Sequence, residues 1–286
     1  LLGGAGVDVL DGGSGADSLA GGDGNDYYFV DNIGDLVVES NAGATGGTDI
    51  VYSALAAYTL SANVEIGRIL STGSANLSGN GLANVLFAGL GNNVLDGSAG
   101  ADTVSWQYGV SGGTGITASL ASGTAGGSGS DTLIGIEHLT GSANADSLTG
   151  DGNANTLDGG AGNDTLAGGL GNDWLIGSSG ADTFRFDTLP NGVSNRDTIV
   201  GFSVIDDSIA LENAVFTALA SGPLAAGAFR SGAGATSAAD ADDLLIYDTT
   251  TGALYYDDAG NTGAGPVQIA LIGSAPALTS EDFIVT

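Results

Sequence analysis

A nine-residue repeat is the feature that most constrains the fold of this 286-residue chain. In residues 159–184 (GGAGNDTLAGGLGNDWLIGSSGADTF) an acidic residue recurs at Asp164, Asp173 and Asp182, and an apolar residue follows two positions after each. A period of nine scatters these positions around an α-helix, and each glycine would destabilise a helix by roughly 1 kcal/mol. The segment instead predicts a six-residue turn followed by a three-residue strand. Two repeats then make one coil, and residues eighteen apart stack.

Stacking brings the acidic side chains of successive coils together. Strands of one sheet lie about 4.7–4.9 Å apart, so Asp164 lies next to Asp182. Two carboxylates at this separation repel by roughly 3 kcal/mol at an effective dielectric constant near 20. The chain has no Cys and one His, so the ligands available for a neutralising cation are carboxylate and carbonyl oxygens. Because these oxygens suit Ca²⁺ better than Zn²⁺ or Cu²⁺, the repeat predicts a series of bound calcium ions.

The charge and composition exclude several classes of protein. The formal net charge is −29, with four arginines and no lysine, which argues against nucleic-acid binding. Acidic chains are often disordered, but 42% of the residues are hydrophobic and recur in register, which predicts folding that depends on metal. Without cysteine, bound ions replace disulfides as crosslinks. No apolar run predicts a transmembrane segment. Leu1 lies within a repeat, without Met or a signal-peptide pattern, which indicates a fragment of a longer protein.

Three arrays of the repeat organise the chain. Array 1 spans residues 1–29, array 2 spans 70–105 and array 3 spans 132–186. The acid position holds, in chain order, Asp8, Asp17 and Asp26 in array 1; Ala75, Asn84, Asn93 and Asp102 in array 2; and Glu137, Asp146, Asn155, Asp164, Asp173 and Asp182 in array 3. Arrays 2 and 3 align at an offset of 80 residues, which indicates an internal duplication.

The remaining segments predict β-structure that completes the solenoid. Residues 30–69 are rich in Val, Ile and Tyr and predict a spacer that continues the stack. Residues 106–131 predict a loop or hairpin insertion. Residues 187–286 have strand and hairpin patterns and predict a cap that covers the open end of the last coil.

In these repeats the chain resembles the C-terminal half of RTX exoproteins. Residues 180–211 (GADTFRFD…RDTIVGFSVIDDSIAL) are similar to the segment that follows the repeats in serralysin-type proteases. Residues 244–272 and the tail LTSEDFIVT are similar to the C-terminal target region of type I secretion substrates, in which an acid, here Asp282, precedes a short apolar tail. The resemblance implies an all-β fold, a right-handed parallel β-roll (β-solenoid) with a C-terminal β-rich cap.

The resemblance also implies how calcium is held, through alternate turn carbonyls and the Asp side chain, between turns eighteen residues apart. Carried over to this chain, one ion would join Gly159, Ala161 and Asn163 to Ser178, Gly180 and Asp182. The same register implies further metal ligands at Asp8, Asp17, Asp26, Asp102, Asp146, Asp164, Asp173, Gly3, Gly22, Gly24, Gly141, Ala143, Gly150, Gly152, Gly160, Gly162, Gly169 and Gly171. At Asn84, Asn93 and Asn155 a neutral amide replaces the carboxylate, which predicts weaker or empty sites.

Other acidic residues fit the series less strictly. They are candidate ligands too, although an isolated turn acid also stabilises a turn without metal; they are Asp49, Glu65, Asp131, Glu137, Asp197 and Asp207.

The signals for other functions are weak. Tyr28 and Trp174 could stack on sugars, but aromatic residues at strand positions are more often packing residues. His138, the only histidine, is expected on a surface strand. GVSGG (109–113) matches a nucleophile elbow without the strand-to-helix turn or the His–acid pair that the motif needs, and a zinc protease would need two histidines. We therefore expect no enzyme activity in this chain.

The sequence and the resemblance together predict a calcium-binding β-roll, secreted or at the cell surface of a Gram-negative bacterium. It would bind calcium ions and a type I exporter, but no nucleic acid. Extracellular calcium sites have Kd values of roughly 10⁻⁴–10⁻³ M, so the chain would fold after export, with metal binding and folding as one reaction. One alternative is a self-associating subunit of a surface layer, filament or adhesin. Another is the secretion tail of an extracellular protease, lipase or epimerase whose catalytic domain precedes Leu1.

Overall fold

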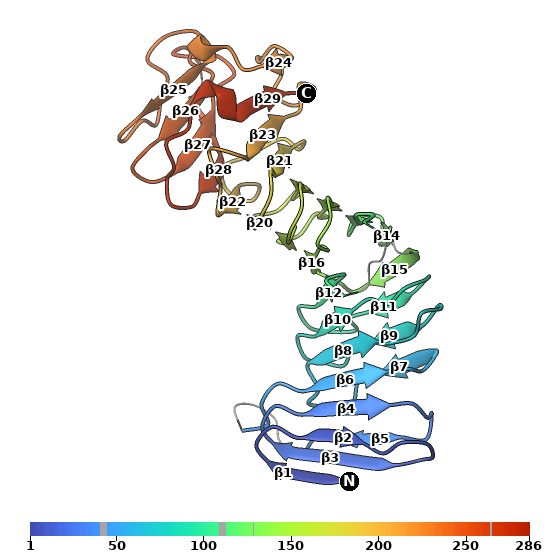
Figure 1. Cartoon of the computed structure of the whole chain (residues 1–286). Helices are drawn as coiled ribbons and strands as arrows, with labels where there is room; N and C mark the ends of the chain where they lie inside the picture. Colours follow the sequence, from blue (N-terminus) through green and yellow to red (C-terminus); the bar gives the residue numbers. More distant parts are fainter. Residues whose placement is uncertain (41–44, 109–112, 128, 264) are drawn as a thin grey trace. The chain divides into compact units, whose positions relative to one another are not determined.

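The fold is an all-β parallel β-roll, seen in the computed structural model of the chain (Figure 1). The structure describes residues 1–40, 45–108, 113–127, 129–263 and 265–286. Helical segments among these residues are limited to two short 3-10 helices, η1 (Ala226–Ala228) and η2 (Ser280–Asp282). No helix in the described part of the chain is long and apolar enough to cross a bilayer. The chain divides into two compact units, unit 1 (Leu1–Ser142) and unit 2 (Ala143–Thr286).

Unit 1 has one long parallel sheet and shorter sheets from the other half of each coil. The long sheet runs β2 (Val9–Asp11), β4 (Tyr27–Val30), β6 (Ile50–Ser53), β8 (Ile66–Ile69), β10 (Val85–Phe87), β12 (Thr103–Ser105) and β16 (His138–Thr140). The other strands are β1 (Leu2–Ala5), β3 (Ser18–Asp23) and β5 (Leu36–Val38), then β7 (Ala57–Thr59), β9 (Asn76–Ser78), β11 (Val94–Asp96) and β15 (Ser130–Ile134). Two antiparallel strands, β13 (Thr117–Ser119) and β14 (Thr124–Gly126), precede β15.

Register in unit 1 follows the repeat. Val9 pairs with Tyr27, eighteen residues on, and β9 and β11 pair with the same spacing. The spacing lengthens where extra chain enters: Thr103 pairs with His138 and Val94 with Thr132, because β13 and β14 lie between them in sequence. The coil therefore keeps its strand positions while its connections vary in length.

In both units the apolar position of the nonapeptide contributes to the core, because alternate side chains of a strand point to opposite faces. The residues at this position are almost fully buried; they are Leu10, Leu19, Leu77, Leu86, Leu95 and Val104 in unit 1 and Leu148, Leu157, Leu166, Leu175 and Phe184 in unit 2. Burying one such side chain contributes roughly 1.5–3 kcal/mol. The apolar position of the nonapeptide thus forms the interior of the coil.

Unit 2 continues the same pattern and then closes it. One sheet runs β17 (Ser147–Thr149), β19 (Thr165–Ala167), β21 (Thr183–Phe186), β23 (Ser208–Leu211), β29 (Phe283–Val285) and β24 (Gly222–Pro223). The other runs β18 (Thr156–Asp158), β20 (Trp174–Ile176), β22 (Asp197–Val200), β28 (Val267–Ile272), β27 (Ala253–Tyr256), β26 (Leu245–Asp248) and β25 (Phe229–Gly232). From β28 to β26 the pairing is antiparallel.

The C-terminal strand lies inside its sheet and not at the edge. β29 pairs in parallel with β23 on one side and antiparallel with β24 on the other. β24 contains Pro223, which lacks an N–H and therefore suits the outer position. Extra chain after β23 folds back to cover the tail.

Close packing of the turns requires glycine. Gly22 has a φ of +108°, and a Cβ there would collide with the carbonyl oxygen of Gly4, eighteen residues earlier. Gly180, with a φ of +141°, lies against the carbonyl oxygen of Gly162 in the same way. The turns thus bring carbonyl groups of neighbouring coils together.

Candidate calcium sites

The acid at the end of each turn bridges two coils. In unit 2 the N–H of Asp146 donates to Oδ1 of Asp164 at 2.7 Å, and the N–H of Asp164 donates to Oδ1 of Asp182 at 2.9 Å. In unit 1 the N–H of Asp8 donates to Oδ1 of Asp26 at 2.8 Å. Each carboxylate therefore accepts a hydrogen bond from the acid position one coil earlier. We call each such series a carboxylate ladder.

The acids outside the strict repeats extend these ladders. Their carboxylate oxygens accept the N–H of the preceding ladder position as follows: Asp49 from Asp26 (2.7 Å), Glu65 from Asp49 (2.9 Å), Asp131 from Asn93 (2.9 Å), Glu137 from Asp102 (2.8 Å), Asp197 from Asp173 (3.1 Å) and Asp207 from Asp182 (2.9 Å). Asp49, Asp131 and Asp197 are also buried. These residues have the position of ladder acids, and their role as metal ligands is a proposal taken up below.

Two ladder-related residues were missed in the sequence. Oδ1 of Asp35 accepts the N–H of Asp17 at 3.1 Å. The eighteen-residue spacing between Asp17 and Asp35 was a usable signal. Glu39 follows β5 and is buried, but no repeat pattern marks it.

In several ladder acids the second carboxylate oxygen has no hydrogen-bond partner among the described residues, whereas Oδ2 of Asp131 accepts from Trp106 and Oδ2 of Asp207 accepts from Ser203. Buried oxygens that have no hydrogen-bond partner among the described residues include Oδ2 of Asp8, Asp26, Asp49, Asp102, Asp164 and Asp173. The oxygen faces the first glycine of its own turn: a Cβ at Gly3 would lie 2.7 Å from Oδ2 of Asp8. A buried charged oxygen without a partner is costly, so a cation fits at these positions.

Side chains alone do not complete a metal site. In the described part of the chain, no three Asp, Glu or His side chains form a cluster that could hold an ion. Turn carbonyls must supply the remaining ligands, and a set of carboxylate and carbonyl oxygens is the one that Ca²⁺ prefers.

The turns of array 3 show which carbonyls are already used. Ser179 donates its N–H to the carbonyl of Gly160 at 3.0 Å and accepts the N–H of Gly162 at 2.9 Å, so the turns are bonded to each other directly. The carbonyl of Ala161 takes no part in these two bonds. Gly160, which the register implied as a ligand, instead uses its carbonyl in turn-to-turn bonding.

Most of the other implied turn residues lie in connections between strands, but Gly3 and Gly22, which were expected in turns, lie within β1 and β3. The N–H of Gly150 donates to the carbonyl of Ala167 at 2.9 Å. Gly171 has a φ of +124° and lies against the carbonyl oxygen of Asn153. Gly24 lies against that of Gly6. The positive-φ Ser178 donates its hydroxyl to Asp158 at 2.9 Å. Gly141, Ala143, Gly152, Gly159 and Asn163 also lie in turns or connections.

In the asparagine coils a protein group donates to the turn carbonyls. Nδ2 of Asn84 donates to the carbonyls of Val64 (3.0 Å) and Glu65 (3.2 Å), and Nδ2 of Asn93 donates to the carbonyl of Ala75 at 2.8 Å. An amide N–H supplies the positive end of a dipole where a carboxylate would need an ion. This is a physical reason to expect weak or absent calcium binding at these turns.

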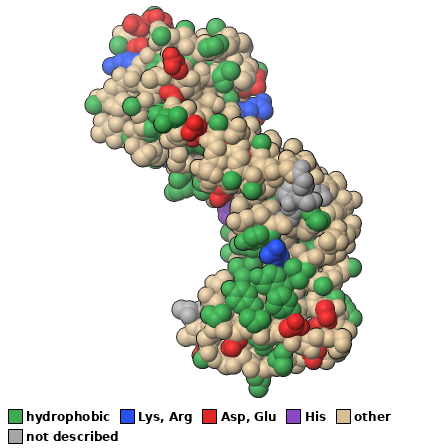
Figure 2. All heavy atoms as spheres, viewed as in Figure 1, with side chains coloured by type: hydrophobic (Ala, Val, Ile, Leu, Met, Phe, Trp, Pro, Cys, Tyr) green, Lys and Arg blue, Asp and Glu red, His purple; other side chains and the backbone are tan. Residues whose placement is uncertain are grey.

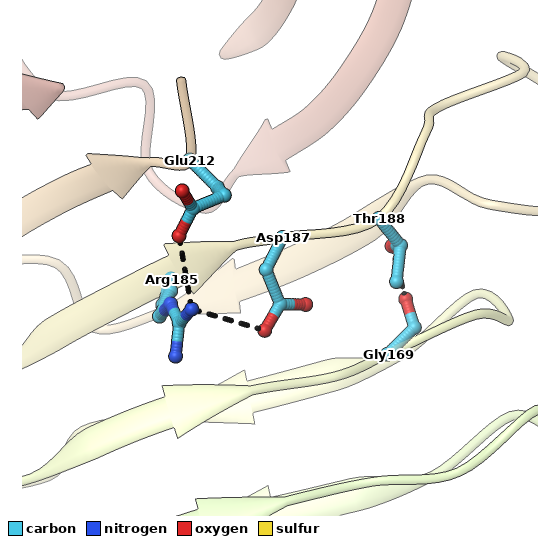
Figure 3. Close-up of polar contacts among 5 residues, drawn as sticks. All are labelled: Gly169, Arg185, Asp187, Thr188 and Glu212. Carbon is cyan, nitrogen blue, oxygen red and sulfur yellow. Dashed lines mark hydrogen bonds and ion pairs between the residues drawn. The ribbon is translucent and has the colours of Figure 1, made fainter. Parts of the chain in front are cut away.

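Just after array 3, a side chain again donates a hydrogen bond to a turn carbonyl (Figure 3). The hydroxyl of Thr188 donates to the carbonyl of Gly169 at 2.6 Å. Nearby, the guanidinium of Arg185 lies 3.0 Å from a carboxylate oxygen of Glu212 and 3.7 Å from one of Asp187. The carbonyl of Gly169, an implied ligand, is thus engaged by a side chain.

The residues considered for other functions have ordinary positions. The ring of Tyr28 is fully buried, which excludes it as a surface for sugar stacking, whereas Trp174 is 55% exposed on β20. His138 is half-buried at the start of β16. Of the GVSGG motif, residues 109–112 lie outside the described residues.

Burial changes the protonation of the ladder acids. Burial, followed by the charges of Glu39, Glu65 and Asp26, raises the pKa of Asp49 to about 7, although the hydrogen bond from Asp26 opposes the shift. Burial and neighbouring ladder charges raise the pKa of Asp164 to about 6. Without a cation, these carboxylates hold protons at mildly acidic pH.

We therefore expect the calcium-free chain to become more stable as the pH falls from about 8 to about 5. The raised folded-state pKa values of Asp49 and Asp164 give stability that is fully present below the unfolded pKa and is lost as the pH rises through about 6 to 7. Circular dichroism in chelator at several pH values measures this through the folded fraction of the chain. Saturating calcium should remove the trend, because the ion takes the place of the proton; constant stability in chelator would contradict the argument.

We also expect Asp164→Asn to raise the calcium concentration needed for folding more than Asn84→Ala does. Asn keeps the shape of Asp164 but removes the charge from its unpartnered Oδ2. Asn84 makes its hydrogen bonds without an ion, so its loss should lower stability at every calcium concentration. Calcium titrations followed by circular dichroism compare the midpoints; equal midpoint shifts would reject the distinction.

A comparison with protein families agrees with the repeat geometry. A family model described as RTX calcium-binding nonapeptide repeat (4 copies) matches residues 1–32, 78–105, 134–166 and 158–187. No curated protein matches the chain. Among solved structures, the extracellular lipase LipA from Serratia marcescens aligns with 85% of this chain at 16% identity, with a TM-score of 0.24.

The lipase alignment carries no argument about this chain, because its TM-score is low and this chain covers only 45% of the lipase chain. The family-model matches and the observed coils are sufficient to assign the repeat type and the fold. The chain carries RTX calcium-binding nonapeptide repeats folded as a parallel β-roll.

Proposed function

We propose that this chain is a calcium-dependent folding module of a secreted protein. The observation that supports it is the set of buried ladder oxygens, such as Oδ2 of Asp26, Asp102 and Asp164, that have no partner among the described residues. Each is fixed by the hydrogen bond that the other oxygen of the same carboxylate accepts. Calcium ions, held by these oxygens and by turn carbonyls, would supply the missing positive charge.

The energetics make metal binding and folding one process. The ladder exists only when coils stack, so the unfolded chain offers no preformed site, and the binding free energy becomes folding free energy. Extracellular calcium sites bind with Kd values of roughly 10⁻⁴–10⁻³ M. A chain with such sites stays unfolded where calcium is scarce and folds where it is millimolar.

We expect the full chain to be largely unfolded in chelator at about pH 8 and to gain β-structure when millimolar Ca²⁺ is added. Magnesium should substitute poorly, because its small octahedral shell does not suit turn carbonyls. Circular dichroism with both ions measures the effect, with an osmotically matched sodium salt as the control. A spectrum that calcium leaves unchanged would reject the proposal.

A second candidate function is self-association, and one observation favours it. The outer face of β4, β6, β8 and β10 carries aromatic rings: Phe29 and Tyr52 stack at 5.0 Å, and the Arg68 guanidinium lies 4.2 Å from the ring of Tyr108. Figure 2 shows hydrophobic side chains gathered on unit 1 around a cation, and Arg68 is the only Lys or Arg in residues 1–142. Sedimentation of the calcium-loaded chain separates the candidates: assembly favours a structural subunit, and a monomer favours the folding module.

We further propose that a type I exporter recognises the C-terminal tail while the chain is still unfolded. In the folded chain the same tail forms β29, between β23 and β24. Deleting residues 282–286 should abolish secretion through such an exporter. It should leave calcium-induced folding of the upstream coils mostly intact, because solenoid stability is nearest-neighbour in character.

Comparing culture supernatant with cell lysate for the full-length and truncated chains tests the export role, and calcium titration of both purified chains tests the structural role. Normal secretion of the truncated chain would reject the first. Loss of folding in array 3 would show that the tail is chiefly structural.

A further inference from the structure

Glu39 is a buried carboxylate at a place where the repeat has glycine. β3 and β5 pair in register, with Leu19 opposite Val37 and Ala20 opposite Val38. The next position therefore matches Glu39 with Gly21, the first glycine of its nonapeptide. Glu39 is only 6% exposed, so the coil places an acid inside the stack where other coils have no side chain.

The contacts of Glu39 bring it to the ladder acid of the preceding coil. Its Oε1 accepts the hydroxyl proton of Tyr28 and the N–H of Gly22, the latter at 3.2 Å. A Cβ at Gly21 would touch Oδ2 of Asp26, the Tyr28 hydroxyl and, at 2.7 Å, Oε1 of Glu39. The carboxylates of Asp26 and Glu39 thus meet over the Cα of Gly21.

Asp49 joins this pair through the ladder. Its Oδ1 accepts the N–H of Asp26 at 2.7 Å, and the charges of Glu39 and Asp26 both act on it and help to raise its pKa. Asp26, Glu39 and Asp49 each keep one buried oxygen without a hydrogen-bond partner among the described residues: Oδ2, Oε2 and Oδ2, respectively.

No Lys or Arg side chain of unit 1 neutralises this cluster. Arg68, the only Lys or Arg of unit 1, lies over the rings of Tyr52 and Tyr108. The unpartnered oxygens thus point to a bound cation.

We propose that Asp26 and Glu39, whose carboxylates meet over Gly21 beside Asp49, hold one Ca²⁺ ion at a site that departs from the repeat rule and binds more tightly than the ordinary turn sites. The inference rests on the proposed calcium-dependent folding. Side chains alone do not form a three-residue metal cluster in the described part of the chain, so backbone carbonyls complete the shell. Ligand charge count tunes calcium affinity, and Glu39 adds a carboxylate that an ordinary nonapeptide turn lacks.

The test compares Glu39→Gln with Glu281→Gln, which removes one charge from an exposed glutamate of η2. Equilibrium dialysis of the full chain at about 10 µM free Ca²⁺ counts the tightly bound ions. The wild type and Glu281→Gln should hold one ion more per chain than Glu39→Gln, whose tightest Kd should weaken about tenfold or more. Binding by Glu39→Gln equal to that of the wild type at this concentration would overturn the inference while leaving the proposed function standing, whereas no calcium binding by any of the three proteins even at millimolar calcium would reject both.

A second measurement separates ligation from a structural role. In Glu39→Gln the new side-chain amide oxygen would still accept the bonds from Tyr28 and Gly22, so in chelator this variant should be more stable than the wild type, because one repelling charge is gone. A purely structural glutamate predicts no gain in chelator and no loss of calcium binding. If Glu39→Gln does not fold, Glu39→Gly restores the repeat glycine and should fold with millimolar calcium without the tight ion. Retention of the tight ion by Glu39→Gly would overturn the proposal.

Discussion

The whole roll depends on one hydrogen bond, in which a ladder carboxylate accepts the N–H of the acid position one coil earlier. The bond from Asp146 to Asp164 is an example. It fixes the rotamer of the side chain, buries the carboxylate and turns its second oxygen toward the turn glycine, as in Asp164 over Gly159. Because that oxygen has no donor among the described residues, coil stacking and charge neutralisation cannot be separated. The glycines, the buried leucines and the strict register all serve to bring these carboxylates into line.

The ladder tolerates irregular coils because it constrains only the acid position. Asp26 and Asp49 are 23 residues apart and Asn93 and Asp131 are 38 apart, yet both pairs make the same bond as residues eighteen apart. The chain also has more than one way to satisfy turn carbonyls. The amide of Asn93 and the hydroxyl of Thr188 donate to them directly. The roll is therefore a mixture of coils that need a cation and coils that the protein completes with its own donors.

The sequence predicted the regular part of this structure well, because a fixed period specifies strand, core and turn together. Leu166 and Leu175 are core residues as their spacing indicated. Asp131 and Asp207 could be named but not placed, since inserted chain breaks the period before each of them. Glu39 could not be found, because its role comes from pairing opposite Gly21 and not from any motif. The cap follows no period either: the order of β25 to β28 results from long-range pairing, and only the structure showed β24 outside the tail strand.

The amide-closed turns at Asn84 and Asn93 have a kinetic consequence. They give the metal-free chain a short region of unit 1 in which side-chain amides bond the turn carbonyls of the preceding coil without ions. In a solenoid with nearest-neighbour energetics, folding can start in any coil and propagate from there. Such a region is a nucleus, and each coil next to it joins as its own ion arrives. The asparagines, which weaken calcium binding locally, thereby give the folding of unit 1 a starting point. Folding then proceeds from the coils of Asn84 and Asn93 toward both ends of unit 1.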